Sequence, residues 1–379
     1  MPLRDAMSSD GPMHDADRAR SSRASSALPR TDSHTTVDRP EAGDAMPALA
    51  QWLRTQTDAR AVRVVGYARL SGGAIQDNSM LDVEIEGGPW QGRRAFVLRT
   101  DAPSRVASSL TRRQEYAVLQ VAHAAGVKAP KPLFFCDDER IIGREFFVME
   151  RLPGIAAAHR LTREPALVPD ANALAHALGA NLALLHAIRP PRVALEALPP
   201  PPANPAHATI AACRAHLDAL HDAHPALEWG LRWCELHAPQ TFDVVLTHGD
   251  YRTGNYLVDG GHLVGVLDWE FAGWGDPRAD LGWFTARCWR FAGQEREGGG
   301  IADLAPFIAG YASVAGRGIS RSELDYWQVV AHLRWAIIAL QQAQRHLAGG
   351  ERSLELALTG RIVHELEYQM LEIVARSFR

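Results

Sequence analysis

The eight residues 248–255, with the sequence HGDYRTGN, place several side chains that could do chemistry in one short loop. Asp250 could orient an attacking hydroxyl and accept its proton, and Arg252 could neutralise charge on a phosphoryl group during transfer. Asn255 offers a neutral oxygen and Asp268 a charged one, and Mg²⁺ prefers such ligands. Because phosphoryl transfer depends mainly on positioning and charge neutralisation, the motif indicates that reaction class. The plainer alternative is a surface loop whose Asp and Asn only cap turns.

The segments on either side of this motif predict how it is positioned. A short strand at 244–246 should lead into the loop. An Asp-Gly-Gly turn at 259–261 favours a hairpin whose strands span 256–258 and 262–267. The returning strand of this hairpin would bring Asp268 back toward the loop.

This arrangement resembles the catalytic loop of the protein kinases, in which an Asp is followed five residues later by an Asn and then by an Asp-Phe-Gly segment. The corresponding residues here are Asp250, Asn255 and Asp268, the last of them in Asp-Trp-Glu. The His-Gly-Asp form of the loop, with Gly-Asp-Pro at 275–277 and Asp-Leu-Gly at 280–282, is similar to the aminoglycoside phosphotransferase-type kinases.

The resemblance covers about residues 60–345 and implies an α+β, protein-kinase-like fold, with a small β-rich lobe and a large, mainly helical lobe. It implies that ATP binds between the lobes with Mg²⁺, and that a hydroxyl of a small molecule receives the γ-phosphate. Asp250 would be the catalytic base, and Asn255 and Asp268 the Mg²⁺ ligands. Asp280 would support the loop from beneath, or it could cap the helix that follows.

The first part of the chain is rich in strand signals. Leu81, Val83 and Ile85 alternate with acidic residues, which is the period of a half-buried strand. The expected order is three strands (63–70, 81–86, 94–100), one helix (108–125) and two strands (132–136, 145–150).

Four residues of this region fall where kinases hold the phosphates of ATP. Gly72 and Gly73 lie in a turn between the first two strands, where backbone N–H groups could cradle phosphates, although a plain hairpin loop would look alike. Arg99 stands where kinases place a lysine, and Glu115 where the partner glutamate of that lysine would be. This pair would orient the phosphates, or it could be an ordinary salt bridge.

The turn at 152–154 is a candidate hinge between lobes at 47–150 and 151–379. Glu150 and Leu152 belong to the segment that would bind adenine through backbone groups, although an edge strand feeding a turn explains it equally well. Beyond the hinge, helices are expected at 171–188, 207–222, 225–237, 278–290, 301–314, 321–347 and 353–377, with a loop at 190–205.

The composition argues against several other classes of protein. The 379 residues suit two lobes, and 46% hydrophobic with 22% charged residues is typical of a globular protein without a membrane span. The net charge of −4 gives no sign of a nucleic-acid surface. The four scattered cysteines lack zinc-ligand spacing and fit a reducing cytoplasm. Residues 1–46 lack aromatic side chains, so a disordered tail is expected there, without the apolar core of a signal peptide.

The pattern indicates a reaction type and leaves the acceptor and the oligomeric state open. One alternative is a nucleotide-binding pseudokinase that acts as a regulatory module, toward which Arg99 in place of lysine points. Another is a metal-dependent hydrolase with His248 and Asp250 as ligands, but further histidines at ligand spacing are missing. Aromatic residues are frequent in the second half of the chain, and some of them could line a substrate pocket or hold a cationic amine, or they could pack in the core. They are Trp269, Trp274, Trp283, Trp289, Tyr326, Trp327 and Trp335.

Overall fold

The computed structural model of the chain describes residues 45–70, 76–101, 109–220, 222–348, 353–376 and 378. Of the predicted tail at 1–46, residues 1–44 lie outside the described residues. The turn that contains Gly72 and Gly73 also lies outside them.

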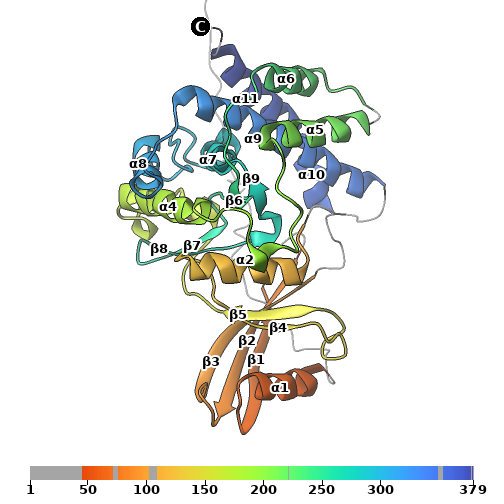
Figure 1. Cartoon of the computed structure of the whole chain (residues 1–379), viewed down its shortest axis with the longest axis vertical. Coiled ribbons are helices and arrows are strands. Elements are labelled where there is room, and N and C mark those ends of the chain that lie inside the picture. The colour runs from red at the N-terminus through yellow and green to blue at the C-terminus, as the bar shows by residue number, and fades with distance from the viewer. Residues whose placement is uncertain are drawn as a thin grey trace, which may run out of the picture. The chain divides into compact units, whose positions relative to one another are not determined.

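A five-stranded antiparallel sheet dominates the small lobe, as the strand pattern predicts (Figure 1). Its strands are β1 (Ala61–Arg69), β2 (Gln76–Glu86), β3 (Gly92–Asp101), β4 (Pro132–Cys136) and β5 (Phe146–Glu150), in the order β1-β2-β3-β5-β4. Leu81, Val83 and Ile85 on β2 are buried, which matches their alternation with acidic residues. β3 pairs with both β2 and β5, so Arg99 lies on the central strand of the sheet.

A helix precedes this sheet. α1 (Ala45–Gln56) packs on the small-lobe core through Leu49 and Leu53, which are fully buried, and Trp52 meets Phe146 edge to face with ring centroids 4.8 Å apart. The small lobe therefore begins with a helix and not, as expected, with a strand. The i, i+3, i+4 spacing of these apolar residues is the signal for it.

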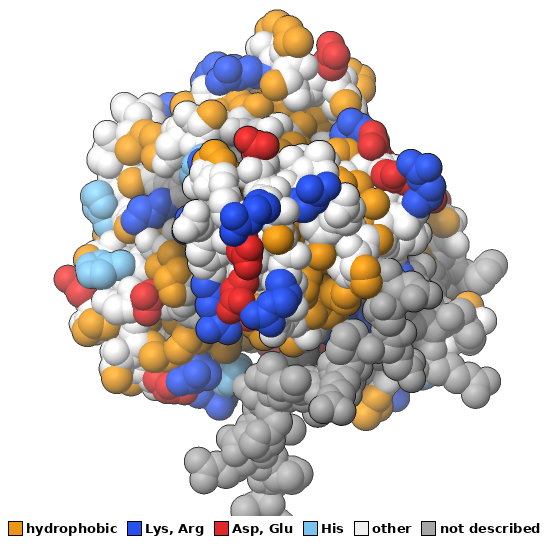
Figure 2. All heavy atoms as spheres, turned by 90° about the horizontal axis from the view of Figure 1, so that it is seen from below, with side chains coloured by type: hydrophobic (Ala, Val, Ile, Leu, Met, Phe, Trp, Pro, Cys, Tyr) orange, Lys and Arg blue, Asp and Glu red, His pale blue; other side chains and the backbone are white. Residues whose placement is uncertain are grey.

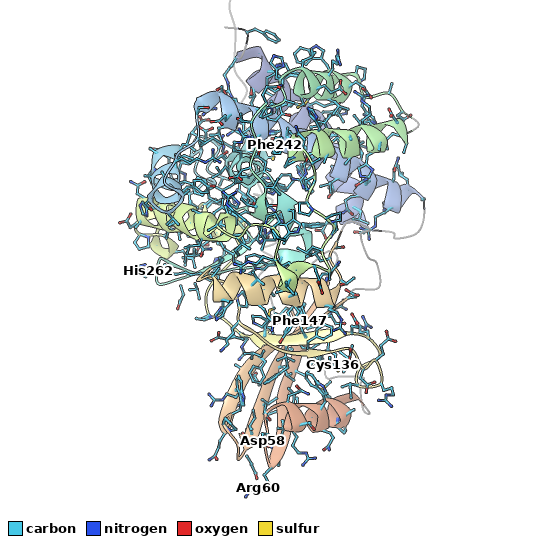
Figure 3. All side chains as sticks on the ribbon, viewed as in Figure 1. Asp58, Arg60, Cys136, Phe147, Phe242 and His262 are labelled. Atoms are coloured by element: carbon cyan, nitrogen blue, oxygen red, sulfur yellow. The ribbon has the colours of Figure 1, made fainter. Side chains whose placement is uncertain are left out.

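α2 (Arg112–Ala124) packs on the sheet and begins at a capping box formed by Thr111 and Gln114. Its buried face includes Glu115, a charged residue that needs a partner there. Figure 3 shows Phe147, on β5, between the sheet and α2, where it belongs to the same apolar cluster as the helix.

The outer end of the small lobe carries charges of both signs side by side (Figure 2). Arg60 lies 3.1 Å from Glu86, and Arg63 pairs with Glu84 across strands β1 and β2. Exposed pairs of this kind contribute little to stability. They do give this end of the lobe a mixed surface without a dominant sign of charge.

The rest of the chain is mainly helical, with two small sheets. The helices are α3 (Ala158–Leu161), α4 (Ala171–His186), α5 (Pro205–Asp218), α6 (Pro225–Leu236), α7 (Pro277–Thr285), α8 (Leu304–Ala315), α9 (Arg321–Leu347), α10 (Leu354–Arg361) and α11 (Val363–Arg376). The strands are β6 (Val245–Thr247), which pairs with β9 (Gly273–Gly275), and β7 (Tyr256–Asp259), which pairs with β8 (His262–Val266) in the expected hairpin.

Several details differ from expectation. β9 was not expected, because three residues with two glycines carry almost no strand signal. α7 ends at Thr285, and the chain continues in a short 3-10 turn, so the predicted helix at 278–290 is too long. The predicted helix at 353–377 is two helices, α10 and α11, which meet at Ile362.

Close packing of α4 against α8 depends on two glycines. A Cβ atom on Gly179 would lie 2.0 Å from the carbonyl oxygen of Phe307, and one on Gly310 would lie 1.9 Å from that of His176. The contact thus requires glycine at both positions, and it fixes the helix that ends in His186. α9 packs against α6, α7, α10 and α11 (Figure 1). In the part of the chain that the structure describes, no helix has both the length and the apolar character to cross a bilayer.

Candidate functional site

The loop that carries the HGDYRTGN motif is anchored by Asp280, a buried residue of α7. Its carboxylate accepts hydrogen bonds from the backbone N–H groups of His248 (2.7 Å) and Gly249 (2.9 Å), and it lies 3.1 Å from His186 Nε2. Burial alone would raise the pKa of Asp280, but the contact with His186 and the donors of the loop hold this pKa below its usual range. An ionised carboxylate therefore fixes the start of the loop.

Two residues of the motif hold its backbone in place. Gly249 has a φ of 78°, and a Cβ atom there would lie 2.3 Å from the carbonyl oxygen of Phe271, so only glycine fits. His248 is buried, and burial lowers its pKa. Its neutral ring donates from Nε2 to the carbonyl oxygen of Leu267 (2.9 Å) and accepts the N–H of Asp250 at Nδ1 (3.2 Å). Neither ring nitrogen is left to bind a metal.

Three side chains hold the carboxylate of Asp250. Oδ1 accepts hydrogen bonds from Trp283 Nε1 (2.8 Å) and Arg252 Nε (3.0 Å), and Oδ2 accepts one from Asn255 Nδ2 (2.6 Å). The side chain of Asp250 is 15% exposed. Its orientation is thus fixed, while part of the carboxylate stays open to solvent.

Arg252 faces Asp250 in this structure. Its guanidinium carbon also lies 4.5 Å from the centre of the Trp289 ring, and Nη1 donates to the carbonyl oxygen of Thr253 (3.3 Å). Arg252 was expected to neutralise charge on a phosphoryl group, but its guanidinium already pairs with the carboxylate of Asp250. The guanidinium is one-quarter exposed.

Asn255 and Asp268 are the two expected metal ligands. Asn255 donates from Nδ2 to both the backbone and the side chain of Asp250, and its backbone carbonyl accepts the N–H of Leu267. Asp268 follows in a left-handed conformation with φ 59° and is 43% exposed. A non-glycine residue seldom adopts this conformation, and such strain clusters at functional sites. The hairpin thus joins the two residues to one loop.

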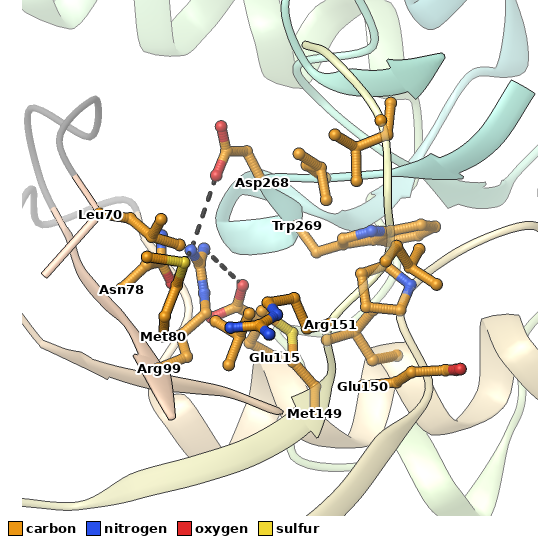
Figure 4. A pocket seen from close by; sticks show the side chains of 17 residues that line it. Leu70, Asn78, Met80, Arg99, Glu115, Met149, Glu150, Arg151, Asp268 and Trp269 are labelled. Carbon is orange, nitrogen blue, oxygen red and sulfur yellow. Dashed lines mark hydrogen bonds and ion pairs between the residues drawn. The ribbon is translucent and has the colours of Figure 1, made fainter. Parts of the chain in front are cut away.

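A cleft of about 320 Å³ lies beside Asp268, and both lobes line it (Figure 4). The small lobe contributes Leu70, Asn78, Met80, Val97, Arg99, Glu115, Leu119, Pro130, Met149 and Glu150, and the large lobe Arg151, Leu152, Gly154, Leu257, Leu267, Asp268 and Trp269. The expected residues Arg99, Glu115, Glu150 and Leu152 all line this one cleft. Gly72 and Gly73 lie outside the described residues.

Arg99 connects the two lobes at the polar end of this cleft. Its Nη2 lies 2.6 Å from Glu115 Oε1, and its Nη1 lies 3.6 Å from Asp268 Oδ1 (Figure 4). Burial would lower the pKa of Arg99, but the carboxylates of Glu115 and Asp268 more than offset it, so the pKa is raised. The expected Arg99–Glu115 pair is formed, and it faces the carboxylate expected to bind metal.

Two neighbours of the candidate site residues were not expected. Arg112, which is buried, pairs with Glu115 and lies 2.7 Å from Asp101 at Nε, so Glu115 bridges two arginines. The i, i+3 spacing of Arg112 and Glu115 was the available signal. Trp283 donates to Asp250 across 33 positions of sequence, and no local pattern predicts such a contact. Among the described residues, no cluster of three or more His, Cys, Asp or Glu forms a metal site.

The chain belongs to the phosphotransferase enzyme family, whose model matches residues 67–317. Among curated proteins it is similar to acyl-CoA dehydrogenase family member 11 of Pongo abelii, with 26% identity over 306 residues, which are 76% of this chain and 38% of that protein. The chain therefore spans little more than a third of the length of this relative.

Solved structures of phosphotransferases share the fold. A candidate aminoglycoside phosphotransferase from Ralstonia eutropha aligns with a TM-score of 0.68 at 21% identity, over 87% of this chain and 98% of the other. A thermostable mutant of an aminoglycoside phosphotransferase, in a ternary complex with ADP and hygromycin B, aligns with a TM-score of 0.56 at 17% identity, over 86% and 98% of the two chains. The fold is thus the two-lobed, protein-kinase-like α+β fold that the motif implies.

Proposed function

We propose that the protein transfers the γ-phosphate of ATP to a hydroxyl group of a small molecule. The observation that carries this proposal is the Asp250 loop, which is anchored by buried hydrogen bonds and lies next to a cleft with Arg99, Glu115 and Asp268 at its polar end. The family membership supports the same reaction class. The related structure with ADP and hygromycin B supports a nucleotide and a small-molecule acceptor.

The nucleotide occupies the cleft in this proposal. The apolar part of the cleft suits adenine. The segment from Glu150 to Leu152 lies where the proposed small lobe (47–150) meets the proposed large lobe (151–379), and it supplies backbone groups for the base edge. Arg99, held by Glu115, orients the phosphates by charge. An arginine that is already paired with one carboxylate still has further N–H groups for an oxyanion.

The residues expected to hold Mg²⁺ fit that ion. Asn255 uses its amide nitrogen on Asp250, so its amide oxygen is the atom left for a cation, and Asp268 adds a carboxylate. A set of one neutral and one charged oxygen suits Mg²⁺, which keeps waters and substrate phosphates as its other ligands. When bound, the ion would neutralise charge on the phosphates.

Asp250 orients the acceptor hydroxyl in this proposal. The acceptor oxygen forms a bond to the γ-phosphorus, the bond between this phosphorus and the β,γ-bridging oxygen breaks, and ADP leaves. The hydroxyl proton passes to the Asp250 carboxylate. Trp283 and Asn255 keep the carboxylate oriented, and Arg252 is close enough to stabilise its charge.

A screen for phosphorylated product tests the proposal. The full chain is incubated with Mg²⁺, ATP and a panel of hydroxylated metabolites, including sugars, amino alcohols, hydroxy acids and aminoglycosides, and the products are detected by mass spectrometry. At least one compound should give ADP and a phosphomonoester in equal amounts. If ATP binds tightly but no compound accepts phosphate, the chain is a nucleotide-binding regulatory module instead.

A further inference from the structure

A second cavity, of about 380 Å³, lies beside the catalytic loop and apart from the nucleotide cleft. Helices α5 and α9 and strand β9 form most of its wall, and the residue before Asp250, Gly249, lines it together with Thr247. The apolar part of the wall includes Ile337, Ile338 and Trp327 from α9, and polar groups line the rest. A molecule that fills this cavity would therefore contact the backbone of the loop that carries Asp250.

Two of the charged residues that line this cavity, Asp276 and Asp280, already have partners inside the protein. Asp276 receives two hydrogen bonds from the guanidinium of Arg278, at 2.9 and 2.6 Å, and Asp280 is used by the catalytic loop. Both acids are 1% exposed, and these hydrogen bonds already compensate their charges inside the protein. They offer little to a ligand.

Arg334 is different. It lines the cavity from α9 and is half-buried, and within the described residues no ion pair joins it to a carboxylate. Its guanidinium carbon lies 4.8 Å from the centre of the Trp283 ring, whose Nε1 donates to Asp250. One indole therefore separates the cation from the catalytic carboxylate. A guanidinium in this position keeps its N–H groups for an anion.

We infer that the acceptor is a hydroxylated organic anion with an apolar body, and that Arg334 binds its carboxylate or phosphate group. This inference rests on the proposed phosphotransfer at Asp250 and names the class of its acceptor. The apolar wall from α5 and α9 contacts the body of the molecule, and its hydroxyl reaches Asp250. Neutral and cationic alcohols of the same shape leave Arg334 without a partner, and a cation is also repelled by it.

Binding measurements on the full chain, saturated with Mg²⁺ and a non-hydrolysable ATP analogue, test this inference. The probes are ω-hydroxyhexanoate, its methyl ester, ω-hydroxyhexyl phosphate and ω-aminohexanol, each titrated by calorimetry. The carboxylate, the phosphate or both should bind at least about tenfold more tightly than the ester, and the amine should bind most weakly. The tighter of the two anions identifies the group that Arg334 binds.

Three variants make the assignment specific to Arg334. Arg334→Met should remove the preference for anions, and Arg334→Lys should keep most of it. Arg192→Met changes an exposed arginine elsewhere in the chain and should behave like the wild type. The assignment is overturned if acid and ester bind equally, if neither binds, or if Arg334→Met keeps the preference. Affinity for the ATP analogue is measured on the same samples, so loss of the nucleotide site is seen separately.

Discussion

At the scale of single residues, Asp250 is oriented before any substrate arrives. Both of its carboxylate oxygens accept hydrogen bonds, from Trp283, Arg252 and Asn255. A side chain held in this way spends little conformational freedom on reaching the geometry for reaction. Arg252 and Asn255 belong to the same loop as Asp250, whereas Trp283 lies 33 positions away on α7. The hydrogen bond from Trp283 can be removed by itself.

Trp283→Phe removes this hydrogen bond and keeps an aromatic ring. We expect kcat to fall about tenfold, since a hydrogen bond to a charged group contributes on the order of 1.5 kcal/mol or more, while the KM for ATP stays within twofold. The matched control is Trp289→Phe, because the Nε1 of Trp289 makes no hydrogen bond in the structure. Steady-state kinetics of both variants measure these effects. Equal kcat values for the two variants would show that the Trp283 hydrogen bond does not contribute to the reaction.

Asp268 and Arg99 face each other at 3.6 Å but have different roles in the proposal. Asp268→Asn should weaken Mg²⁺-dependent ATP binding more than Arg99→Lys, because the first change removes the charged metal ligand and the second keeps the charge. Calorimetric titration of ATP with and without Mg²⁺ measures this. Without Mg²⁺ the effect of Asp268→Asn should largely vanish, and the opposite ranking would require another place for the nucleotide.

The sequence predicts much of this site, because its chemistry is concentrated in short motifs. Asp250, Asn255 and Asp268 are joined by one loop and one hairpin, and local turn residues define both. The Arg99–Glu115 pair follows from the resemblance to kinases, and the structure brings the two side chains together. Trp283 contacts Asp250, and Arg334 contacts the Trp283 ring, between elements that meet only in the fold. Spacing along the chain therefore does not predict these contacts.

At the scale of elements, the long helix α9 carries a buried histidine. His332 is fully buried, and its Nδ1 lies 2.7 Å from the carbonyl oxygen of Gln328. Burial, with a smaller effect from Arg290, lowers the pKa of His332 to about 4. The folded chain therefore keeps this ring neutral at pH values where the unfolded chain protonates it.

Acid should weaken the fold through His332. The unfolded state binds a proton below its pKa of 6.5, whereas the folded state does so only near pH 4, so stability is lost as pH falls through this window. Between pH 7 and pH 5 the loss is about 2 kcal/mol. The variant His332→Gln should show a flatter dependence of unfolding free energy on pH, measured by urea titration. An unchanged slope would contradict the assignment.

The elements themselves are predictable where periodicity is strong. The alternation on β2 and the turn between β7 and β8 both appear in the structure. β9 is missed because Gly-Trp-Gly has no strand preference and is ordered only by pairing with β6. The break between α10 and α11 is missed because Ile362 is not a helix breaker by itself.

At the scale of the whole molecule, the start of the small lobe differs most from the sequence-based prediction, because a helix, α1, precedes the sheet. Leu49 and Leu53 of α1 belong to the apolar core of the sheet, so the folded region begins no later than Ala45. Residues before it remain a predicted tail, on the basis of their composition.

Two shortened chains test this boundary. A chain that begins at residue 38 should keep its melting temperature within ~2 °C and its activity, because the removed residues have few apolar side chains. A chain that begins at residue 58 lacks α1 and should melt more than about 5 °C lower, since burial of each Leu contributes roughly 1.5–3 kcal/mol. Thermal unfolding followed by circular dichroism measures both. Equal melting temperatures for the two would remove α1 from the core.

The most direct test of the central claim is the rate of phosphoryl transfer after Asp250→Ala. With labelled ATP, Mg²⁺ and the acceptor found by the screen, single-turnover transfer should fall about 10²–10⁴-fold, while the affinity for ATP stays within a few-fold. Asp259→Ala, an exposed aspartate of the same hairpin, is the matched control and should transfer like the wild type. If Asp250→Ala keeps more than half of the wild-type rate, Asp250 does not carry the reaction and the account is wrong.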